Sequence, residues 1–427
     1  MARYYILSQR LLSIVMASVL LISCMGLQGY SDGPTANTPV TTWDTAYPEL
    51  LKTKPIRFAD TDRGLDLLTV LKETQAHNDE IRLAQEQILE TQAKEKQHRA
   101  EQKRVFFFLT YFTALDYIER VAKNDLEAAK VHLEAVQQRQ LLLAAKAYTD
   151  ALRAALRTQV ECDQLHVLLG HYRASQYAFT RGDQTAMEVA KIQLATLEQS
   201  ATIAQYRSQW FDGQAKLASL MGQPDMGPWR PIAPTANNTA AMTLSQELNT
   251  PELFPPWFAR LQHWHWVQVS DNTPAWLATA LANRPDIQEL RFKRQALDAL
   301  LRLRRKAFNQ PEAALLASSI RQLDIRLHSA EGQAKNNIEK AFRVLSVAQA
   351  QQHTAQKALA IASRAEMQAA KTVSLGISSQ QTLQEIQASK TRAWVGLLNA
   401  TMDSLLAEFQ VLYESGQLTL GRIEQSL

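Results

Sequence analysis

The sequence has 427 residues, of which 46% are hydrophobic and 21% are charged, a composition typical of a folded protein rather than a disordered chain. The formal net charge of +4 falls to +2 when Arg3 and Arg10 are removed with the leader described next. A charge this small provides no basic surface for nucleic acid, so we expect no nucleic-acid partner.

An N-terminal signal precedes the body of the chain. Two arginines and an apolar run from Leu11 to Ile22 indicate a secretory signal peptide over residues 1–23. The run is shorter than the ~20 apolar residues of a membrane-spanning helix, which favours cleavage over an uncleaved anchor. Residues 21–24, LISC, resemble the lipobox of bacterial lipoproteins, in which the cysteine is lipidated and becomes the mature N-terminus. Met25 stands where an aspartate would indicate inner-membrane retention, so the resemblance implies a Cys24 lipid anchor in the outer membrane, facing the periplasm.

Proline positions divide the rest of the chain. All fourteen prolines lie between Pro34 and Pro55, between Pro224 and Pro285, or at Pro311. The first group belongs to residues 24–61, which we expect to form an irregular tether behind the lipidated N-terminus. Because proline in a helix interior costs about 3 kcal/mol, the two long tracts without proline are where long helices can run.

The two proline-free tracts contain copies of one another. A shift of 194 positions aligns Gly182 with Gly376 and Gly222 with Gly416, without a gap, and places SLGISSQQTLQEI over TRGDQTAMEVAKI. An internal duplication of this kind predicts two structural repeats. The short turns around Gly182 and Gly376 each predict a hairpin of two helices.

Both copies carry the spacing of a coiled coil. Side chains recur every three or four positions, the pattern by which one helix packs along another. In the first copy they are Val189, Ile192, Thr196, Gln199, Ile203, Tyr206, Trp210, Gly213, Leu217 and Leu220, and in the second Leu383, Ile386, Leu397, Thr401, Leu405, Phe409 and Leu412.

These patterns predict an all-α fold of two tandem repeats of long antiparallel coiled-coil hairpins. Repeat one covers residues 62–222, with Asp62 as the N-cap of a first helix that continues through the charged run QAKEKQHRAEQKR. Residues 223–273 form a linker rich in proline and tryptophan, which we expect to fold back onto the helices. Repeat two covers residues 274–427.

The most apolar and aromatic run of the mature chain is Val105 to Phe112. It is compatible with a packed helix, a contact with a membrane interface, or a remnant of a strand. A helical pattern resumes at Asp116, which favours the first two interpretations.

The sequence shows little that indicates catalysis or a cofactor. His263 and His265 flank a tryptophan, and Cys162 with His166 has the i, i+4 spacing of a metal pair, but neither pair has a third ligand nearby. We therefore expect no metal and no cofactor, and we interpret Cys162 as a buried helix residue. The sequence also contains no glycine-rich phosphate loop and no nucleophile elbow, so we expect no enzyme activity.

The duplication and two short motifs resemble the TolC family of outer-membrane efflux channels. The segment ALANRPDIQ, from Ala280 to Gln288, is similar to the start of the second repeat in that family, and Leu375-Gly376-Ile377-Ser378 is similar to its hairpin tip. The resemblance implies a homotrimer that forms a helical periplasmic cylinder, whose tips bind a periplasmic adaptor protein of an inner-membrane pump. The implied adaptor-binding residues are Arg181, Gly182, Asp183, Leu375, Gly376, Ile377 and Ser378.

Two features depart from the family pattern. The family inserts a pair of membrane strands into each repeat, but Val105–Thr113 and Ala307–Arg321 are too short for strands of ~9–11 residues with turns, so we expect little or no β-barrel. The family also rings its pore with acidic side chains near the tips. Repeat one offers Asp183 and Glu188, whereas the first carboxylate after Gly376 is Glu385, so a cation-selective gate does not carry over.

Two functions remain open from the sequence. The chain is either a subunit of an oligomeric export conduit in a tripartite efflux system, or a non-conducting scaffold or adaptor lipoprotein that kept the helical hairpins. The oligomeric state of the mature protein distinguishes them.

Overall fold

The computed structural model describes residues 64–65, 67–105, 112–223, 230–231, 273–306 and 310–426. Contacts divide the chain into two units, Met1–Lys54 and Pro55–Leu427, and all described residues belong to the second. The predictions about the signal peptide, Cys24, the tether, the N-cap at Asp62, most of the linker, His263, His265 and residues 106–111 therefore lie outside the described residues. Residues 307–309 also lie outside them, at the start of the second stretch on which the expectation about membrane strands depends, whereas residues 310–321 of that stretch are helical.

The described part of the chain is almost entirely helical, which confirms the predicted all-α class. Its two short strands, β1 (Gly64–Leu65) and β2 (Arg230–Pro231), pair in parallel. Repeat one contains α4 (Leu67–His77), α5 (Asp79–Val105), α6 (Phe112–Thr180) and α7 (Ala186–Leu220). Repeat two contains α10 (Thr273–Asn283), α11 (Pro285–Lys306), α12 (Gln310–Ser374), α13 (Gln380–Glu414) and α14 (Leu420–Ser426).

Each repeat has one very long helix, α6 in the first and α12 in the second. They contain 69 and 65 residues, so at 1.5 Å per residue each is about 100 Å long. Both proline-free tracts thus form the long helices that their composition predicts. The last of the fourteen prolines, Pro311, lies in the first turn of α12, where a missing N–H costs little.

The prediction of one continuous first helix is wrong. The chain breaks at Asn78 into α4 and α5, because the Asn78 side-chain oxygen accepts hydrogen bonds from the backbone N–H groups of Glu80 and Ile81 at 3.0 and 3.3 Å. This is an N-cap in the middle of the predicted helix. The same side chain donates to the Leu220 carbonyl at 2.8 Å, which ties the break to the end of α7.

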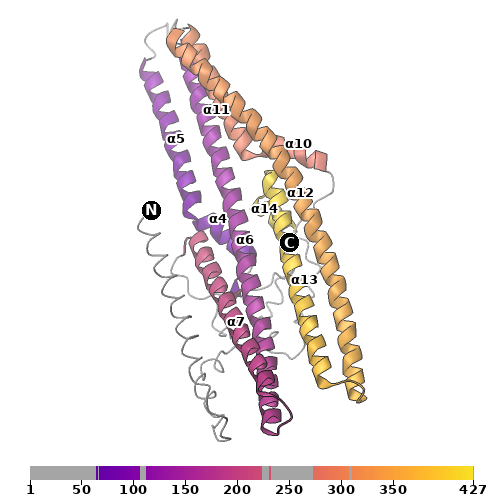
Figure 1. The fold of residues 1–427 in the computed structure, drawn as a ribbon. Coiled ribbons are helices and arrows are strands. Elements are labelled where there is room, and N and C mark those ends of the chain that lie inside the picture. The colour runs from indigo at the N-terminus through magenta and orange to yellow at the C-terminus, as the bar shows by residue number, and fades with distance from the viewer. Residues whose placement is uncertain are drawn as a thin grey trace, which may run out of the picture. The chain divides into compact units, whose positions relative to one another are not determined.

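The long helices organise the packing. Helix α6 packs against α5 and α7 on one side and against α11 and α13 on the other, and α12 packs against α11 and α13. Figure 1 shows α5 and α7 following α6 one after the other, and α11 and α13 following α12 in the same way. The helices therefore lie side by side in the order α5/α7, α6, α11/α13, α12, with α5/α7 at one edge and α12 at the other.

A core cluster joins the two repeats where the shorter helices pack against this layer. Helix α4 packs against α6, α14 against α4, and α10 against α12 and α11. Leu67 and Leu71 of α4, Tyr148 of α6 and Ile423 of α14 are fully buried members of one cluster. Helix α4 covers one face of α6 in this way.

The predicted coiled-coil positions are confirmed by burial. All ten positions of the first copy are buried or half-buried, with Ile203, Trp210 and Leu217 the deepest, and the seven of the second copy behave in the same way. Close approach of α6 and α7 requires small residues, since a Cβ at Gly213 would lie 2.8 Å from the Cβ of Ala151. Cys162 is buried on α6, as predicted.

The end of each hairpin opposite its turn docks on the break in its own repeat. Gly222 and Gly416 both have positive φ, 65° and 69°. A Cβ there would lie 2.3 Å from the His77 carbonyl oxygen and 2.7 Å from that of Asn283. Glycine is required at both positions by backbone conformation and by contact.

An ion-pair network stabilises the second of these junctions. Arg284, between α10 and α11, donates to Glu414 at 2.7 Å and to Asp286 at 2.7 Å. Asn337 of α12 and Gln410 of α13 also donate to the Glu414 carboxylate. Burial by itself lowers the pKa of Arg284, but bonds to the two carboxylates outweigh it and raise that pKa.

Candidate functional site at the hairpin tips

The first hairpin turns at Gly182 through a closed set of backbone hydrogen bonds. Asp183 N–H donates to the Ala178 carbonyl and Gly182 N–H to the Phe179 carbonyl, both at 2.9 Å, and Gly182 has φ of 81°. This is the Schellman arrangement, which satisfies the carbonyls at the end of α6 and requires a left-handed residue. The glycine signal in the sequence therefore marks the turn correctly.

The second hairpin repeats these bonds 194 positions later. Ile377 N–H donates to the Thr372 carbonyl and Gly376 N–H to the Val373 carbonyl, again at 2.9 Å, and Gly376 has φ of 73°. Both turns lie at the same end of the helices (Figure 1). The structure thus places all seven predicted tip residues in two equivalent turns.

The returning helices begin with equivalent caps of different charge. The Thr185 hydroxyl accepts from the Glu188 N–H, and the Glu188 carboxylate accepts from the Thr185 N–H at 2.8 Å, which completes a capping box. That backbone hydrogen bond holds the pKa of Glu188 below its usual value. At the second tip, Ser379 caps α13 by accepting from the Thr382 N–H at 3.2 Å, and no carboxylate takes part.

The two tips present different chemistry to solvent. At the first, the Arg181 guanidinium lies over the Tyr177 ring at 4.2 Å, beside exposed Asp183. At the second, Leu375 is 63% exposed and Ile377 is 73% exposed, on either side of Gly376. An apolar pair held on a rigid turn is suited to packing against another protein, and a charged aromatic tip is suited to polar contacts.

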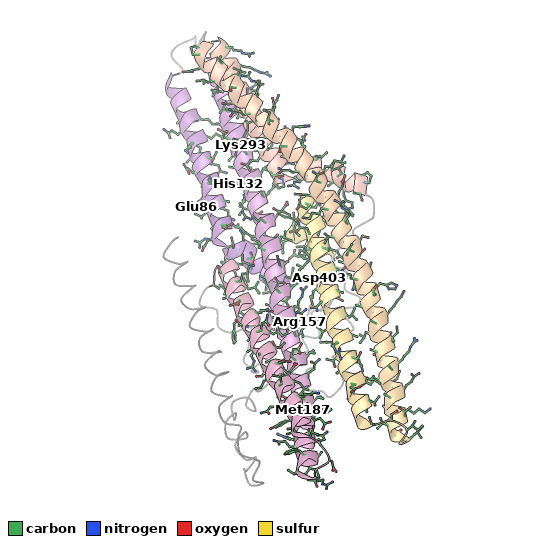
Figure 2. The ribbon with its side chains drawn as sticks, in the orientation of Figure 1. Glu86, His132, Arg157, Met187, Lys293 and Asp403 are labelled. Atoms are coloured by element: carbon green, nitrogen blue, oxygen red, sulfur yellow. The ribbon has the colours of Figure 1, made fainter. Side chains whose placement is uncertain are left out.

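Sequence reasoning missed three of the residues that shape the tips. Thr185 and Ser379 are the N-caps, and a serine or threonine shortly after a helix-ending glycine is a signal that could have found them. Tyr177 was missed because its role depends on the contact with Arg181, four residues later on the same helix. Figure 2 shows the side chains along these helices, with Met187 on the returning helix of the first hairpin.

The described residues contain no group of three or more His, Cys, Asp or Glu side chains that could hold a metal ion. Cys162 and His166 remain on one face of α6, with Cys162 buried. Among the described helices, none combines the length and apolar character needed to cross a membrane.

The fold is that of several solved outer-membrane proteins. CusC aligns with a TM-score of 0.63 at 14% identity, over 82% of this chain and 92% of that one. The Campylobacter jejuni CmeC outer membrane channel aligns with a TM-score of 0.63 at 12% identity, over 82% and 85% of the two chains. The Neisseria gonorrhoeae MtrE outer membrane channel aligns with a TM-score of 0.60 at 14% identity, over 82% and 89%.

Comparison with protein-family models and with curated protein sequences gives no match. The likeness is therefore one of fold. It confirms the helical-hairpin architecture that the resemblance to the TolC family implied.

Proposed function

We propose that this chain is the outer-membrane component of a tripartite efflux or export system. In this proposal the mature protein is held at the outer membrane by a lipid on Cys24, and three copies form a helical conduit in the periplasm. The hairpin tips bind a periplasmic adaptor protein, which connects the conduit to an inner-membrane pump. The shared fold with outer-membrane channels supports the channel class.

The observation that carries the proposal is the pair of apolar edges of the helix layer. On α12, Ile325 and Ile361 are strongly exposed and lie 36 residues apart, which is ten helical turns and hence one face. At the other edge, Met187 and Leu194 of α7 are also strongly exposed, on the side opposite the buried Trp210. Two different apolar edges on one chain suit a head-to-tail contact, which closes into a ring when the rotation fits.

The oligomeric state of detergent-extracted mature protein tests this proposal. Light scattering should give the mass of three chains, and the double variant Ile325→Lys, Ile361→Lys should lower it. Leu375→Lys is the matched control, since this residue is equally apolar and exposed but lies at a tip. A wild-type monomer would overturn the conduit and favour a non-conducting scaffold.

The tip role is supported by exposure and rigidity. Leu375 and Ile377 are the two most exposed aliphatic side chains of their turn, and the closed backbone hydrogen bonds fix the turn before any partner arrives. A preformed apolar tip binds without the entropy cost of ordering a loop. This supports assigning the adaptor contact first to the second tip.

A further inference from the structure

A groove of about 950 Å³ lies between α6, α12 and α13, away from the hairpin tips. Its volume is within the range of small-molecule sites in proteins. The aliphatic side chains that line it are Leu142 and Leu143 of α6, Val344 and Val347 of α12, and Leu406 of α13.

Three cations also line this groove, namely Lys146 of α6 and Lys340 and Arg343 of α12. All three are exposed, and none makes an ion pair or side-chain hydrogen bond within the described ranges. The one acid in the lining, Asp403, is already bound by Arg153 at 2.6 Å. Glu339, one turn from Arg343, does not line the groove. The groove therefore combines an apolar surface with an uncompensated positive charge.

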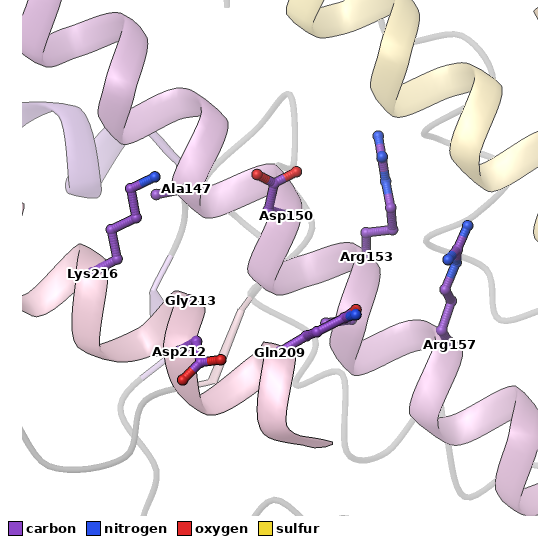
Figure 3. Close-up of a pocket in the computed structure, with 9 residues that line it drawn as sticks. Ala147, Asp150, Arg153, Arg157, Gln209, Asp212, Gly213 and Lys216 are labelled. Carbon is purple, nitrogen blue, oxygen red and sulfur yellow. The ribbon is translucent and has the colours of Figure 1, made fainter. Parts of the chain in front are cut away.

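The neighbouring groove between α6 and α7 does not have this character. It is smaller, about 400 Å³, and its charged lining consists of two acids and three cations, namely Asp150, Asp212, Arg153, Arg157 and Lys216 (Figure 3). The Arg157 guanidinium also bonds the Tyr206 hydroxyl at 3.2 Å. Because Arg153 is already paired with Asp403, the two acids of the smaller groove face only two other cations, and this groove lacks the excess of positive charge found in the larger one.

The larger groove opens on the face of α6 that the short helices leave uncovered. Lys146, Asp150 and Arg153 follow one another at helical spacing and so share one face of α6. Tyr148, which belongs to the core cluster with α4, points to the opposite face. A ligand in solution can therefore reach the groove without displacing α4, α10 or α14.

We propose that this groove binds small amphipathic organic anions, such as an aromatic ring system that carries a carboxylate or sulfonate. The apolar body of such a molecule packs against Leu142, Val344 and Val347, and its anionic group lies among Lys146, Lys340 and Arg343. A ligand reaches full affinity only when it contacts both the cations and the apolar surface of the groove. Neutral and cationic compounds of the same size therefore bind more weakly.

The site is formed within one chain, so its existence does not depend on the oligomer. The functional role of the groove rests on the proposed conduit function, in which transported molecules contact this uncovered face. Amphipathic anions are then a cargo class for the conduit. Ile325 and Ile361 do not line the groove, so failure of the binding test alone would leave the oligomeric conduit standing. Arg343 lies five turns from each of them and hence on the same face of α12, so the oligomeric mass of each groove variant is measured beside its probe binding.

The experiment compares two fluorescent probes that share a ring system. Purified mature protein is titrated with 8-anilinonaphthalene-1-sulfonate, which is anionic, and with N-phenyl-1-naphthylamine, which is neutral. The double variant Lys340→Gln, Arg343→Gln should weaken sulfonate binding by about three- to tenfold, the effect of losing two partly solvated charges. Binding of the neutral probe should change by less than about twofold, and added salt should weaken only sulfonate binding.

The matched control is Lys335→Gln, Lys357→Gln, which removes two exposed lysines of α12 that do not line the groove. It should leave sulfonate affinity unchanged, and circular dichroism should show equal helix content in all three proteins. Equal sulfonate affinity in the groove variant, or an equal loss in the control, would overturn the proposal. A changed oligomeric mass with unchanged probe binding would identify the groove as a contact between copies instead.

Discussion

Gly182 and Gly376 occupy equivalent left-handed positions, 194 residues apart, each closing a helix with the same two backbone hydrogen bonds. Neither has a heavy atom within 4 Å of the place where a Cβ would lie. The need for glycine at the tips is thus one of backbone conformation alone. At Gly222 and Gly416, by contrast, conformation and close contact act together.

Gly376→Val should therefore destabilise the second hairpin by about 1–2 kcal/mol, because a β-branched residue is strained at positive φ. Gly396→Ala is the informative comparison, since Gly396 lies inside α13 with open space around it. It should stabilise by about 0.5–1 kcal/mol through helix propensity. Denaturant unfolding measures both changes. If Gly376→Val left the free energy of unfolding unchanged, residue 376 would not adopt the positive φ that the structure shows.

The buried ion pair of Arg284 with Glu414 should contribute strongly to stability. Their side chains are 12% and 9% exposed, so Arg284→Met leaves a carboxylate largely buried and should destabilise by about 2–4 kcal/mol. Arg291→Met removes a pair with Glu331 whose side chains are 40% and 34% exposed, and it should cost less than about 1 kcal/mol. Equal effects in thermal unfolding would mean that Arg284 does not anchor the junction.

Much of the fold could be predicted because the chain repeats itself. Helix-ending glycines, proline-free tracts and three-to-four spacing are local signals, and they located both hairpins and the buried positions of α7 and α13. The break at Asn78 was missed because an asparagine inside a helical pattern is ambiguous. Its capping bonds to Glu80 and Ile81 are local, but the bond from its side chain to Leu220, 142 residues away, is a tertiary contact that no local pattern contains.

Of the two candidate sites, the tips could be predicted from the sequence and the groove could not. The tip residues are neighbours in sequence, so their turns could be predicted. The groove cations come from α6 and α12, and Lys146 and Lys340 are brought together only by packing of the two repeats on α13. The Arg153–Asp403 pair, which removes the one acid from the groove, also joins residues 250 positions apart. Such sites follow from tertiary packing and not from local pattern.

Replacing the apolar side chains of the second tip should abolish adaptor binding without affecting the fold. Leu375→Asp with Ile377→Asp places two carboxylates where an apolar partner surface would pack, which should weaken binding at least tenfold. The control is Arg181→Asp at the first tip, where we expect a smaller loss. Cysteine crosslinking in cells from Ser378 and Asp183 measures both contacts. Absence of crosslinks from either tip would remove the adaptor assignment.

Cys24→Ser should release the protein from the membrane. Cys24 lies outside the described residues, and the prediction depends on the lipobox pattern in the sequence. The variant should appear in the soluble periplasmic fraction, whereas Cys162→Ser, a change at the buried cysteine, should remain membrane-bound. Retention of Cys24→Ser after a carbonate wash would show that something other than the lipid holds the protein.

The first tip should loosen in acid while the second does not. Because the backbone hydrogen bond from Thr185 lowers the pKa of Glu188, this carboxylate stabilises the start of α7 above its unfolded pKa, near 4.5. That contribution is lost as the pH falls through the lowered folded-state pKa.

Glu188→Ala should therefore speed amide exchange in the first turn of α7 at pH 7, and the difference from wild type should vanish well below pH 4. Thr382→Ala removes the hydroxyl contact with Ser379 at the uncharged second cap and keeps the cap bond from the Thr382 backbone N–H. Its effect on exchange in the first turn of α13 should be small and equal at both pH values, because no titrating group takes part. Hydrogen-exchange mass spectrometry resolves the two turns, and an effect of Glu188→Ala that persists in acid would show that its carboxylate does not form the cap.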